Sequence, residues 1–494
     1  MPRLPAHLAA FAAFLLVLGG HFLLIDRAGS PVPIHDQWQA EAEYVFLPSL
    51  EGTLNAHLLF HYHGEHRIVP TRLLALALFK LNHDRWDVLL QMTFNAFLAA
   101  LLTAALVLLA RRFLRPPALL LFATAFGALH ASALFYGNAL WGFQSQFYFL
   151  LVFTLTHLAL VLRHAPFSAR WFLGLACSAL ACLSMGSGFF SAAIVALLSL
   201  WRFLAPSYSH LRRPSLLNTL AHLTIVLIAL TTAPHFPSPS VNFAHVLHTF
   251  LHCLAWPIRF YNPWGALLWL PFAVFLFQLA LRFRRAPSHR DLLLAALGLW
   301  VLAQIAAIAW ARSTPAPVIA PRYYDILLLG LAANTLALAR ILRVSRLQLP
   351  LAAHFSLVAA TLLWLGTSGW FAFHFAESHR RYDLPALASY AERQIHHVRT
   401  FLATDNPAAL QSEPYPKIPH PDPAYLAQLL RNPRVRAFLP AELNDLPPPL
   451  LSRVATHLRS FASPLLLAGL VTTFVATTLL IFRPKSLPVP SHPL

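Results

Sequence analysis

The polar side chains that could do chemistry gather in one segment, residues 26–86, which follows the first apolar stretch of the chain. Asp36 lies there in the sequence HDQW, and Glu65, His66 and Arg67 lie in the sequence HGEHR. Elsewhere the chain is mostly apolar. Charged side chains near hydrocarbon are costly, and they persist mainly where they bind ions or take part in reactions. This loop is therefore the predicted location of the function.

Asp36 follows the end of the first apolar stretch by about ten residues. A carboxylate in that position can accept a proton from a hydroxyl group at the membrane surface, or it can hold a divalent cation. Another interpretation is structural. Asp36 is followed three residues later by Gln39, which matches a capping box at the start of a helix. The two roles are compatible with each other.

The residues after Asp36 predict a helix with one apolar face. Trp38, Ala42 and Val45 share that face at helical spacing, and Glu41 lies nearer to it than Glu43. For both glutamates we expect a solvated face of the helix.

Two guanidinium groups, Arg67 and Arg72, lie near Glu65 in the sequence. Such groups suit a phosphate at the membrane surface, because each charge-assisted hydrogen bond contributes about 1.5 to 3 kcal/mol. The alternative is a glutamate–arginine pair at the lipid headgroups. The loop also holds a cluster of four histidines: His57, His61, His63 and His66. They could bind zinc, but their spacing matches no closed zinc site, so the only cofactor we expect is a possible divalent cation.

The composition predicts that this loop is held by a membrane protein. Hydrophobic residues make up 58% of the chain and charged residues 11%, and the mean hydropathy is +0.60. A soluble domain carries roughly 25% charged residues. The formal net charge is +18, but the basic residues form short clusters between apolar stretches, which is the positive-inside pattern and not a nucleic-acid groove. The surplus charge would attract anionic membrane lipids.

About twelve apolar stretches have near-spanning length, on the basis of roughly twenty residues per crossing. They predict an all-α polytopic membrane protein. The predicted spans are residues 8–25, 88–110, 118–136, 147–162, 171–185, 189–203, 216–232, 264–281, 292–311, 324–341, 351–371 and 464–482. Residues 70–81 are apolar but too short to span, so we expect an interfacial helix with Pro70 in its first turn.

Basic residues follow each even-numbered span, which predicts that both termini are cytoplasmic and that the loop 26–86 is exterior. These residues are Arg111, Arg112, Arg115, Arg163, Arg170, Arg202, Arg212, Arg213, Arg282, Arg284, Arg285, Arg290, Arg340, Arg343, Arg346, Arg483 and Lys485. A second exterior segment, residues 376–461, is rich in proline and contains a short helix after Asp422 as its expected N-cap. The predicted organisation is a membrane domain (residues 1–375), this segment, and a last span with a cytoplasmic tail (residues 462–494).

The exterior turn YGNALWGFQSQF offers Asn138, Trp141 and Gln144. Aromatic planes that alternate with amides can stack on sugar rings and bond to their hydroxyls. The alternative for Trp141 is an aromatic residue of the membrane interface.

Arg259 and Arg322 lie at exterior ends of predicted spans, and Tyr323 follows Arg322. Arginines on the exterior side run against the positive-inside trend. They are therefore candidates, together with Arg67 and Arg72, for binding a lipid phosphate. The residues expected to bind the acceptor or the sugar are Trp38, His66, Asn138, Trp141, Gln144 and Tyr323.

The motifs HDQW, EHR, NALWGFQSQ and PRYY, with the Gly186–Gly188 break, give residues 8–371 a resemblance to a known group. The chain resembles the GT-C superfamily of polytopic glycosyltransferases, in particular bacterial relatives of the dolichyl-phosphate-mannose–protein mannosyltransferases. The resemblance implies that Asp36 is the catalytic base, that Glu65 is a second acid, and that Arg67 or Arg322 holds the donor phosphate. Many relatives carry a second acid beside the aspartate, where this chain has Gln37.

The function implied is transfer of a sugar from a polyprenyl-phosphate donor to a hydroxyl of a glycan, lipid or protein, with inversion. The expected location is the periplasmic face of a bacterial inner membrane. Two other classes share this topology: a transporter or flippase of lipid-linked sugars, and a ligase or polymerase of the O-antigen type. Transport is the less favoured class, because the centres of most predicted spans lack the acids that transporters use.

Overall fold

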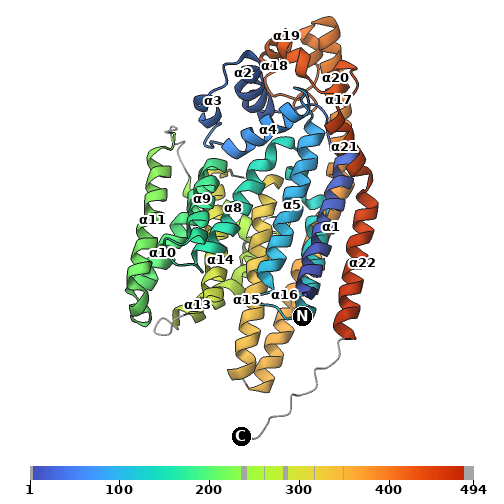
Figure 1. The fold of residues 1–494 in the computed structure, drawn as a ribbon. Helices are drawn as coiled ribbons and strands as arrows, with labels where there is room; N and C mark the ends of the chain where they lie inside the picture. The colour runs from blue at the N-terminus through green and yellow to red at the C-terminus, as the bar shows by residue number, and fades with distance from the viewer. Residues whose placement is uncertain are drawn as a thin grey trace.

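The structure, a computed structural model, describes residues 4–234, 242–260, 262–281, 287–315, 318–348 and 350–482. Helices dominate this part of the chain (Figure 1), as the composition predicts. Within these residues, ten helices are long and apolar enough to cross a membrane, or eleven if one bent pair counts as a span. The protein is therefore an all-α multi-pass membrane protein, and this prediction is confirmed.

Each predicted span overlaps a helix of the structure. These helices are α1 (Leu4–Ala28), α5 (Val88–Ala110), α6 (Pro116–His130), α8 (Ser145–Val161), α9 (Ala169–Ser184), α10 (Phe190–Leu204), α11 (Arg212–Thr231), α13 (Leu270–Leu281), α14 (His289–Arg312), α15 (Tyr324–Gln348), α16 (Leu351–Ser378) and α22 (Ala462–Ile481). Their apolar side chains are compatible with lipid. Their backbone polar groups form hydrogen bonds within each helix, because hydrocarbon offers no hydrogen-bond partners. A short apolar helix, α12 (Phe243–Ala255), was not predicted.

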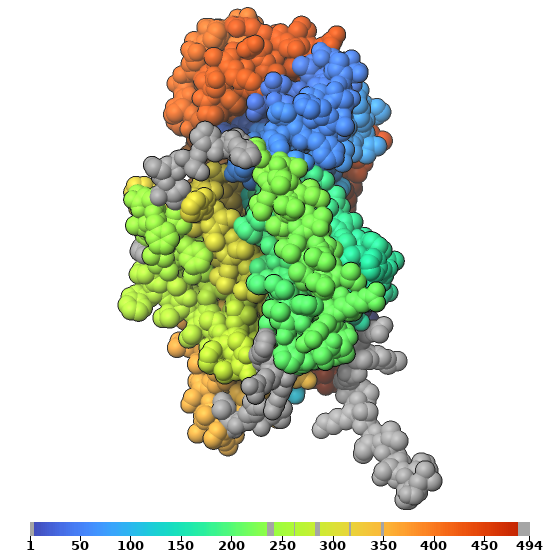
Figure 2. All heavy atoms as spheres, turned by 90° about the vertical axis from the view of Figure 1, so that its left-hand side faces the viewer, coloured from blue at the N-terminus to red at the C-terminus, as the bar shows by residue number. Residues whose placement is uncertain are grey.

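Helices of the first loop and of the C-terminal segment cover one end of the membrane helices (Figure 1). From the first loop come η1 (Trp38–Phe46), α2 (Leu47–Glu51), α3 (Ala56–Phe60) and α4 (Val69–Leu81), and from the C-terminal segment come α17 (Leu384–Thr404), α18 (Pro423–Arg431), α19 (Pro433–Phe438), α20 (Ala441–Asn444) and α21 (Leu450–Ser460). We call residues 26–86 and 376–461 together the cap. Figure 2 shows its two parts side by side, the first loop in blue and the C-terminal segment in orange.

One aromatic core joins the two parts of the cap. The rings of Phe46 and Phe79 stack with centroids 4.3 Å apart, and Phe438 of the C-terminal segment packs on both. The N–H of Trp86 donates to the carbonyl oxygen of Phe438 at 2.9 Å. The predicted helices in the cap are confirmed: α4 begins with a proline in its first turn, and the carboxylate of Asp422 caps α18.

The basic clusters gather at the end opposite the cap. Arg290 donates to the carbonyl oxygen of Arg112 at 3.1 Å. Burial and the positive charges of Arg163 and Arg290 lower the pKa of Arg112, so these three clusters lie close together. Arg282, Arg284, Arg285, Arg483 and Lys485 lie outside the described residues.

One predicted span is broken close to the cap. Helix α6 ends at His130, and the chain bends by 54° into η2 (Ala133–Phe135) and α7 (Tyr136–Ala139). The bend brings Gly137 against the backbone of η7 (Pro321–Tyr323), where a Cβ on Gly137 would lie 2.7 Å from the backbone nitrogen of Arg322. The broken span thus fixes the position of Arg322.

Candidate active site

A cavity of about 520 Å³, which we call the first cavity, opens beside the cap between α10 and α14. Glu65, His66, Arg312 and Tyr323 line its polar end. Its walls are apolar side chains of the membrane helices, and one of them, Trp310, is 59% exposed. Exposed apolar surface on a membrane-spanning helix faces lipid, so the cavity connects a polar site to the hydrocarbon.

Glu65 and Arg312 form an ion pair at the polar end, with Glu65 Oε1 and an Arg312 terminal nitrogen 2.9 Å apart. Arg312 Nε also donates to the hydroxyl of Tyr323 at 3.3 Å. Burial raises the pKa of Glu65, but the positive charges of His66, Arg312 and Arg322 outweigh it, so the net pKa falls below its usual value. Arg312 was not predicted, although it directly follows an apolar span on the cap side, as Arg259 and Arg322 flank theirs.

A tight turn of the first loop presents Glu65. His63 and His66 exchange two backbone hydrogen bonds of 2.7 and 3.0 Å, and Gly64 between them has φ +53°. His66 Nδ1 accepts the N–H of Gly186 at 3.0 Å. A Cβ on Gly186 would lie 2.6 Å from the carbonyl oxygen of Glu65. The turn therefore docks on the break between α9 and α10, and only glycine permits this approach.

Asp36 lies at the start of the helix that leads into η1, and two histidines hold its carboxylate. Asp36 Oδ1 is 2.7 Å from His35 Nδ1 and 3.3 Å from His63 Nε2. Burial raises the pKa of Asp36, but the two histidine rings lower it more, and the net pKa lies well below its usual value. The group is therefore ionised. The side chain of Gln37, not that of Asp36, bonds the preceding backbone, since its oxygen accepts the N–H of Ile34 at 3.3 Å.

Asp36 is not among the described residues that line the first cavity, but it lies close enough to Arg312 for their charges to interact. Arg322 is also near. Its guanidinium lies over the ring of Tyr323, 5.3 Å from the centroid, and its charge acts on Glu65. The structure thus brings Asp36, Glu65, Arg312 and Arg322 together.

The C-terminal segment closes over Asp36 from the other side. The N–H of His35 donates to the carbonyl oxygen of Pro419 at 2.7 Å. The His35 ring lies 5.6 Å from that of Tyr415, 6.1 Å from that of His420 and 6.3 Å from that of Trp141. Trp141 was predicted to bind sugar, and it lies beside His35, the residue that contacts Asp36. Tyr415 and His420 were missed, because they are distant in sequence and carry no motif.

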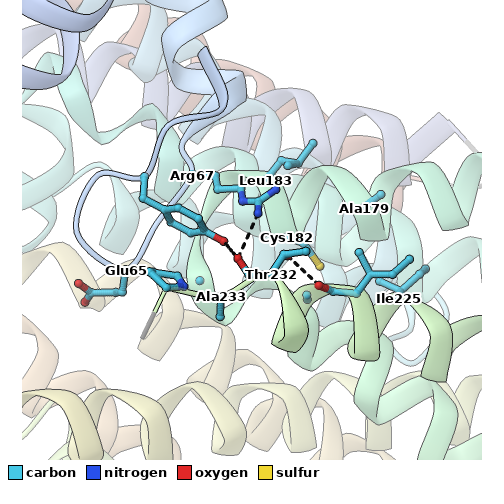
Figure 3. Close-up of a pocket in the computed structure, with 13 residues that line it drawn as sticks. Glu65, Arg67, Ala179, Cys182, Leu183, Ile225, Thr232 and Ala233 are labelled. Atoms are coloured by element: carbon cyan, nitrogen blue, oxygen red, sulfur yellow. Dashed lines mark hydrogen bonds between the residues drawn. The ribbon is translucent and has the colours of Figure 1, made fainter. Parts of the chain in front are cut away.

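Arg67 lies in a different pocket, shown in Figure 3, with a volume of about 230 Å³. It donates to the carbonyl oxygen of Thr232 at 3.1 Å and lies over the ring of Tyr62. Figure 3 shows the Glu65 carboxylate turned away from Arg67. Arg67 therefore binds the end of α11 and does not pair with Glu65.

Arg72 is an interior residue with 1% of its surface exposed. One of its terminal nitrogens donates to the carbonyl oxygens of Leu58 at 3.2 Å and Leu59 at 3.1 Å. A phosphate at the membrane surface does not reach this guanidinium, so Arg72 holds the loop instead. Arg259 lines a separate cavity described below.

Three of the residues predicted to bind acceptor or sugar are buried and do not line the first cavity. Trp38 is fully buried beside Trp86 in the aromatic core of the cap, and Gln144 is 1% exposed. The Asn138 amide donates to the carbonyl oxygen of Arg322 at 2.8 Å and to Asp325 Oδ2 at 2.6 Å. These predictions are corrected: side chains buried away from the cavity cannot contact a sugar there, and Asn138 positions Arg322 instead.

Glu41 is also buried, with 1% of its surface exposed, which corrects the prediction of a solvated face. Its Oε2 accepts from Gln91 at 3.0 Å and from Gln37 at 3.3 Å. Burial raises its pKa to about 7. The reason for the error is that η1 is a π-helix, whose i→i+5 hydrogen bonds widen the turn and rotate side chains away from their α-helical positions. Glu43, two residues on, is exposed as expected.

Within the ranges that the structure describes, no group of three or more histidine, cysteine, aspartate or glutamate side chains is arranged to hold a metal ion. This includes His57, His61, His63 and His66 of the first loop. The chemistry available at the site is that of two carboxylates, two guanidiniums and histidine rings. Comparison with known proteins adds no assignment, since no family model matches this chain and no curated protein matches it.

Proposed function

We propose that this protein is a membrane glycosyltransferase that moves a sugar from a polyprenyl-phosphate donor to an acceptor hydroxyl, with inversion at the anomeric carbon. One observation supports the proposal above all. A cavity open to lipid ends in the ion-paired guanidinium of Arg312, with Arg322 and the ionised carboxylate of Asp36 close by. The acceptor is a glycan, a lipid or a protein.

The first cavity suits a lipid-linked donor. The isoprenoid chain lies along apolar walls that include Phe190 and Trp310, and the phosphate lies at Arg312 and Arg322. Planar guanidiniums match phosphate oxygens in geometry and charge. When the bond to the sugar breaks, the same groups stabilise the departing phosphate, so no acid is needed to protonate it.

Asp36 receives the proton of the acceptor hydroxyl. Both histidines contact Oδ1, which leaves Oδ2 as the oxygen that faces the acceptor. A carboxylate with a low pKa is a weak base in the resting protein. It becomes effective late in the displacement, because the attacking hydroxyl grows acidic as its bond to the anomeric carbon forms. The proton goes to Oδ2, while His35 and His63 remain hydrogen-bond donors to Oδ1 and hold the carboxylate in place.

The orientation follows from charge. The end opposite the cap carries the basic clusters, which is the cytoplasmic mark in bacterial membranes. We therefore place the cap and the site on the periplasmic face of a bacterial inner membrane, with both termini in the cytoplasm.

The test is a transfer assay with the purified protein, a panel of radiolabelled polyprenyl-phosphate sugars and a membrane extract that supplies acceptors. Asp36→Asn should lower the transfer rate by about 10²- to 10⁴-fold, as expected for loss of a general base. The matched control is Asp405→Asn, because Asp405 is an exposed carboxylate of the cap that pairs with Arg431. No transfer from any donor, together with ion-coupled uptake in liposomes, would contradict the proposal and favour a transporter.

A further inference from the structure

A second cavity, of about 610 Å³, lies on the other side of η7 from the first. The neighbouring residues Tyr323 and Tyr324 line different cavities, Tyr323 the first and Tyr324 the second. The two sets of lining residues have no member in common. The second cavity is therefore a separate site, and neither the transferase reaction nor the ion pair of Glu65 uses it.

The mouth of the second cavity faces lipid at the cap end of the membrane helices. Two of its lining side chains are apolar and strongly exposed, Phe260 at 73% and Val318 at 87%. Phe375 on α16 continues the apolar lining. An acyl or isoprenoid chain can enter through this mouth without crossing polar groups.

The polar part of the cavity contains an oriented histidine. His379 Nδ1 lies 2.7 Å from Asp383 Oδ2, one turn further along η8 (His379–Asp383). His379 is 7% exposed, and its Nε2 is buried with no hydrogen-bond partner among the described residues. A carboxylate on Nδ1 holds the proton on that nitrogen, so Nε2 carries a lone pair. A buried acceptor without a partner is costly, and a ligand hydroxyl would satisfy it.

Arg259 supplies a positive charge beside this histidine. Its guanidinium donates to the hydroxyl of Ser378 and lies over the ring of Phe260. Among the described residues it has no carboxylate within ion-pair distance, and most of its N–H groups remain available. Asp383 lies in the same cavity and opposes the attraction of Arg259 for anions, so an anion with one negative charge meets less repulsion there than one with two.

We propose that the second cavity binds a phosphodiester lipid whose headgroup also carries a free hydroxyl, with Arg259 on the phosphate and His379 on the hydroxyl. A phosphodiester carries a single negative charge at neutral pH, so it can pair with Arg259 and is repelled by Asp383 less than a phosphomonoester would be. The apolar lining accommodates the tail of the same molecule.

The experiment measures lipid binding to the full-length protein in detergent by native mass spectrometry, without any sugar donor. The probes are phosphatidylglycerol, phosphatidylmethanol and diacylglycerol. The first two have the same charge, and only phosphatidylglycerol has headgroup hydroxyls. We expect phosphatidylglycerol to bind about three- to tenfold more tightly than phosphatidylmethanol, the range for one hydrogen bond. Diacylglycerol should bind least.

Arg259→Gln should weaken the binding of phosphatidylglycerol by at least about tenfold, because a charge-assisted hydrogen bond to its phosphate is lost. His379→Phe, which keeps a ring of similar shape, should lower phosphatidylglycerol to the affinity of phosphatidylmethanol. Arg312→Ala is the matched control, since it removes a guanidinium from the first cavity only, and it should leave binding unchanged.

Three outcomes would overturn the proposal. Equal binding of diacylglycerol would show that the headgroup is not recognised. Equal losses in Arg259→Gln and Arg312→Ala, or a loss in Arg312→Ala alone, would place the lipid in the first cavity. If free glycerol phosphate competed with an affinity equal to that of phosphatidylglycerol, the cavity would be a site for soluble phosphates and not for a lipid. Because no donor is present, none of these outcomes depends on the transferase activity.

Discussion

The carboxylate of Glu65 lies 2.9 Å from the guanidinium of Arg312, although 247 residues separate the two along the chain. This contact ties the turn of the first loop to the end of α14 at the polar end of the first cavity. Both side chains are nearly half exposed, so the pair contributes little to stability. Its position beside Tyr323 and near Asp36 suits the binding of a charged substrate, as the proposed function requires.

Arg312→Ala should raise the KM for the polyprenyl-phosphate donor by roughly 10- to 100-fold, because a charge-assisted contact to phosphate is lost. Arg312→Lys should recover part of this loss, since the charge remains without the planar geometry. Arg434→Ala is the control, because Arg434 is another arginine of the cap that pairs with a glutamate, Glu51. An unchanged KM for the donor in Arg312→Ala would show that the donor phosphate does not bind at Arg312.

Glu41 predicts a pH dependence of stability. Burial raises its pKa to about 7 in the folded protein, from an unperturbed value of 4.5. The folded state therefore binds this proton more tightly than the unfolded chain does. The protonated group contributes roughly 3 kcal/mol to the free energy of unfolding. This contribution is fully present below about pH 4.5 and is lost as the pH rises through about 7.

Glu41→Gln should remove this dependence, because a neutral amide fills the same space at every pH. Thermal unfolding in detergent should show the variant gaining stability relative to the native protein between pH 5 and pH 8. Glu43→Gln carries the same change on the exposed side of the same helix and should show no such gain. A stability difference between Glu41→Gln and the native protein that is constant over this range would contradict the assignment.

Replacing Asn138 should weaken donor binding indirectly, because Asn138 holds Arg322 in position and does not contact the donor itself. Its amide holds both the carbonyl oxygen of Arg322 and the buried carboxylate of Asp325, which also lies 2.7 Å from His130 Nε2. Asn138→Ala should lower the free energy of unfolding by about 1 to 3 kcal/mol, because buried groups lose their partners.

The same variant should also raise the donor KM, because Arg322 loses its support, while the KM for the acceptor stays unchanged. Asn444→Ala is the control. Asn444 bonds to two carbonyl oxygens in the cap, so its loss should destabilise the protein without changing the donor KM. If Asn138→Ala raised only the KM for the acceptor, the result would instead support the sequence-based prediction that Asn138 contacts the acceptor.

Hydropathy was enough to predict the membrane helices, because each must be apolar over a set length whatever it packs against. Residues 88–110 were predicted as a span, and α5 has the same bounds. Local capping was also predictable, as Asp422 shows. Glu41 and Arg72 were misjudged for a different reason. Their burial depends on a π-helix and on carbonyl groups of a folded loop, and neither leaves a periodic signal in the sequence.

The site itself was predictable only in part. Asp36, Glu65 and Arg322 stood out by residue type and by their place beside apolar spans, and the structure brings these three together. Arg312 directly follows a predicted span in the same way but was not singled out. Tyr415 and His420 reach His35 only because the aromatic core joins the two parts of the cap. Contacts across such sequence distances are set by tertiary packing.

Gly186 gives the last prediction. A Cβ there would lie 2.6 Å from the carbonyl oxygen of Glu65 and 3.2 Å from His66 Nδ1. Because the nearer atom belongs to the backbone of a tight turn, Gly186→Ala should push the turn away from α10. Glu65 would then move relative to Arg312, and transfer should fall by about 10-fold or more, since small misplacements of catalytic groups are costly.

The matched control for this change is Gly366→Ala on α16, where an added Cβ meets nothing within 4 Å. That variant should keep native activity and gain slight helix stability. A loss of transfer activity in Gly186→Ala could come from unfolding or from displacement of the turn, and thermal unfolding distinguishes the two. A folded protein with reduced transfer supports the docking of the turn as the cause, whereas full activity in Gly186→Ala would show that the contact between the turn and the glycine break does not position the site.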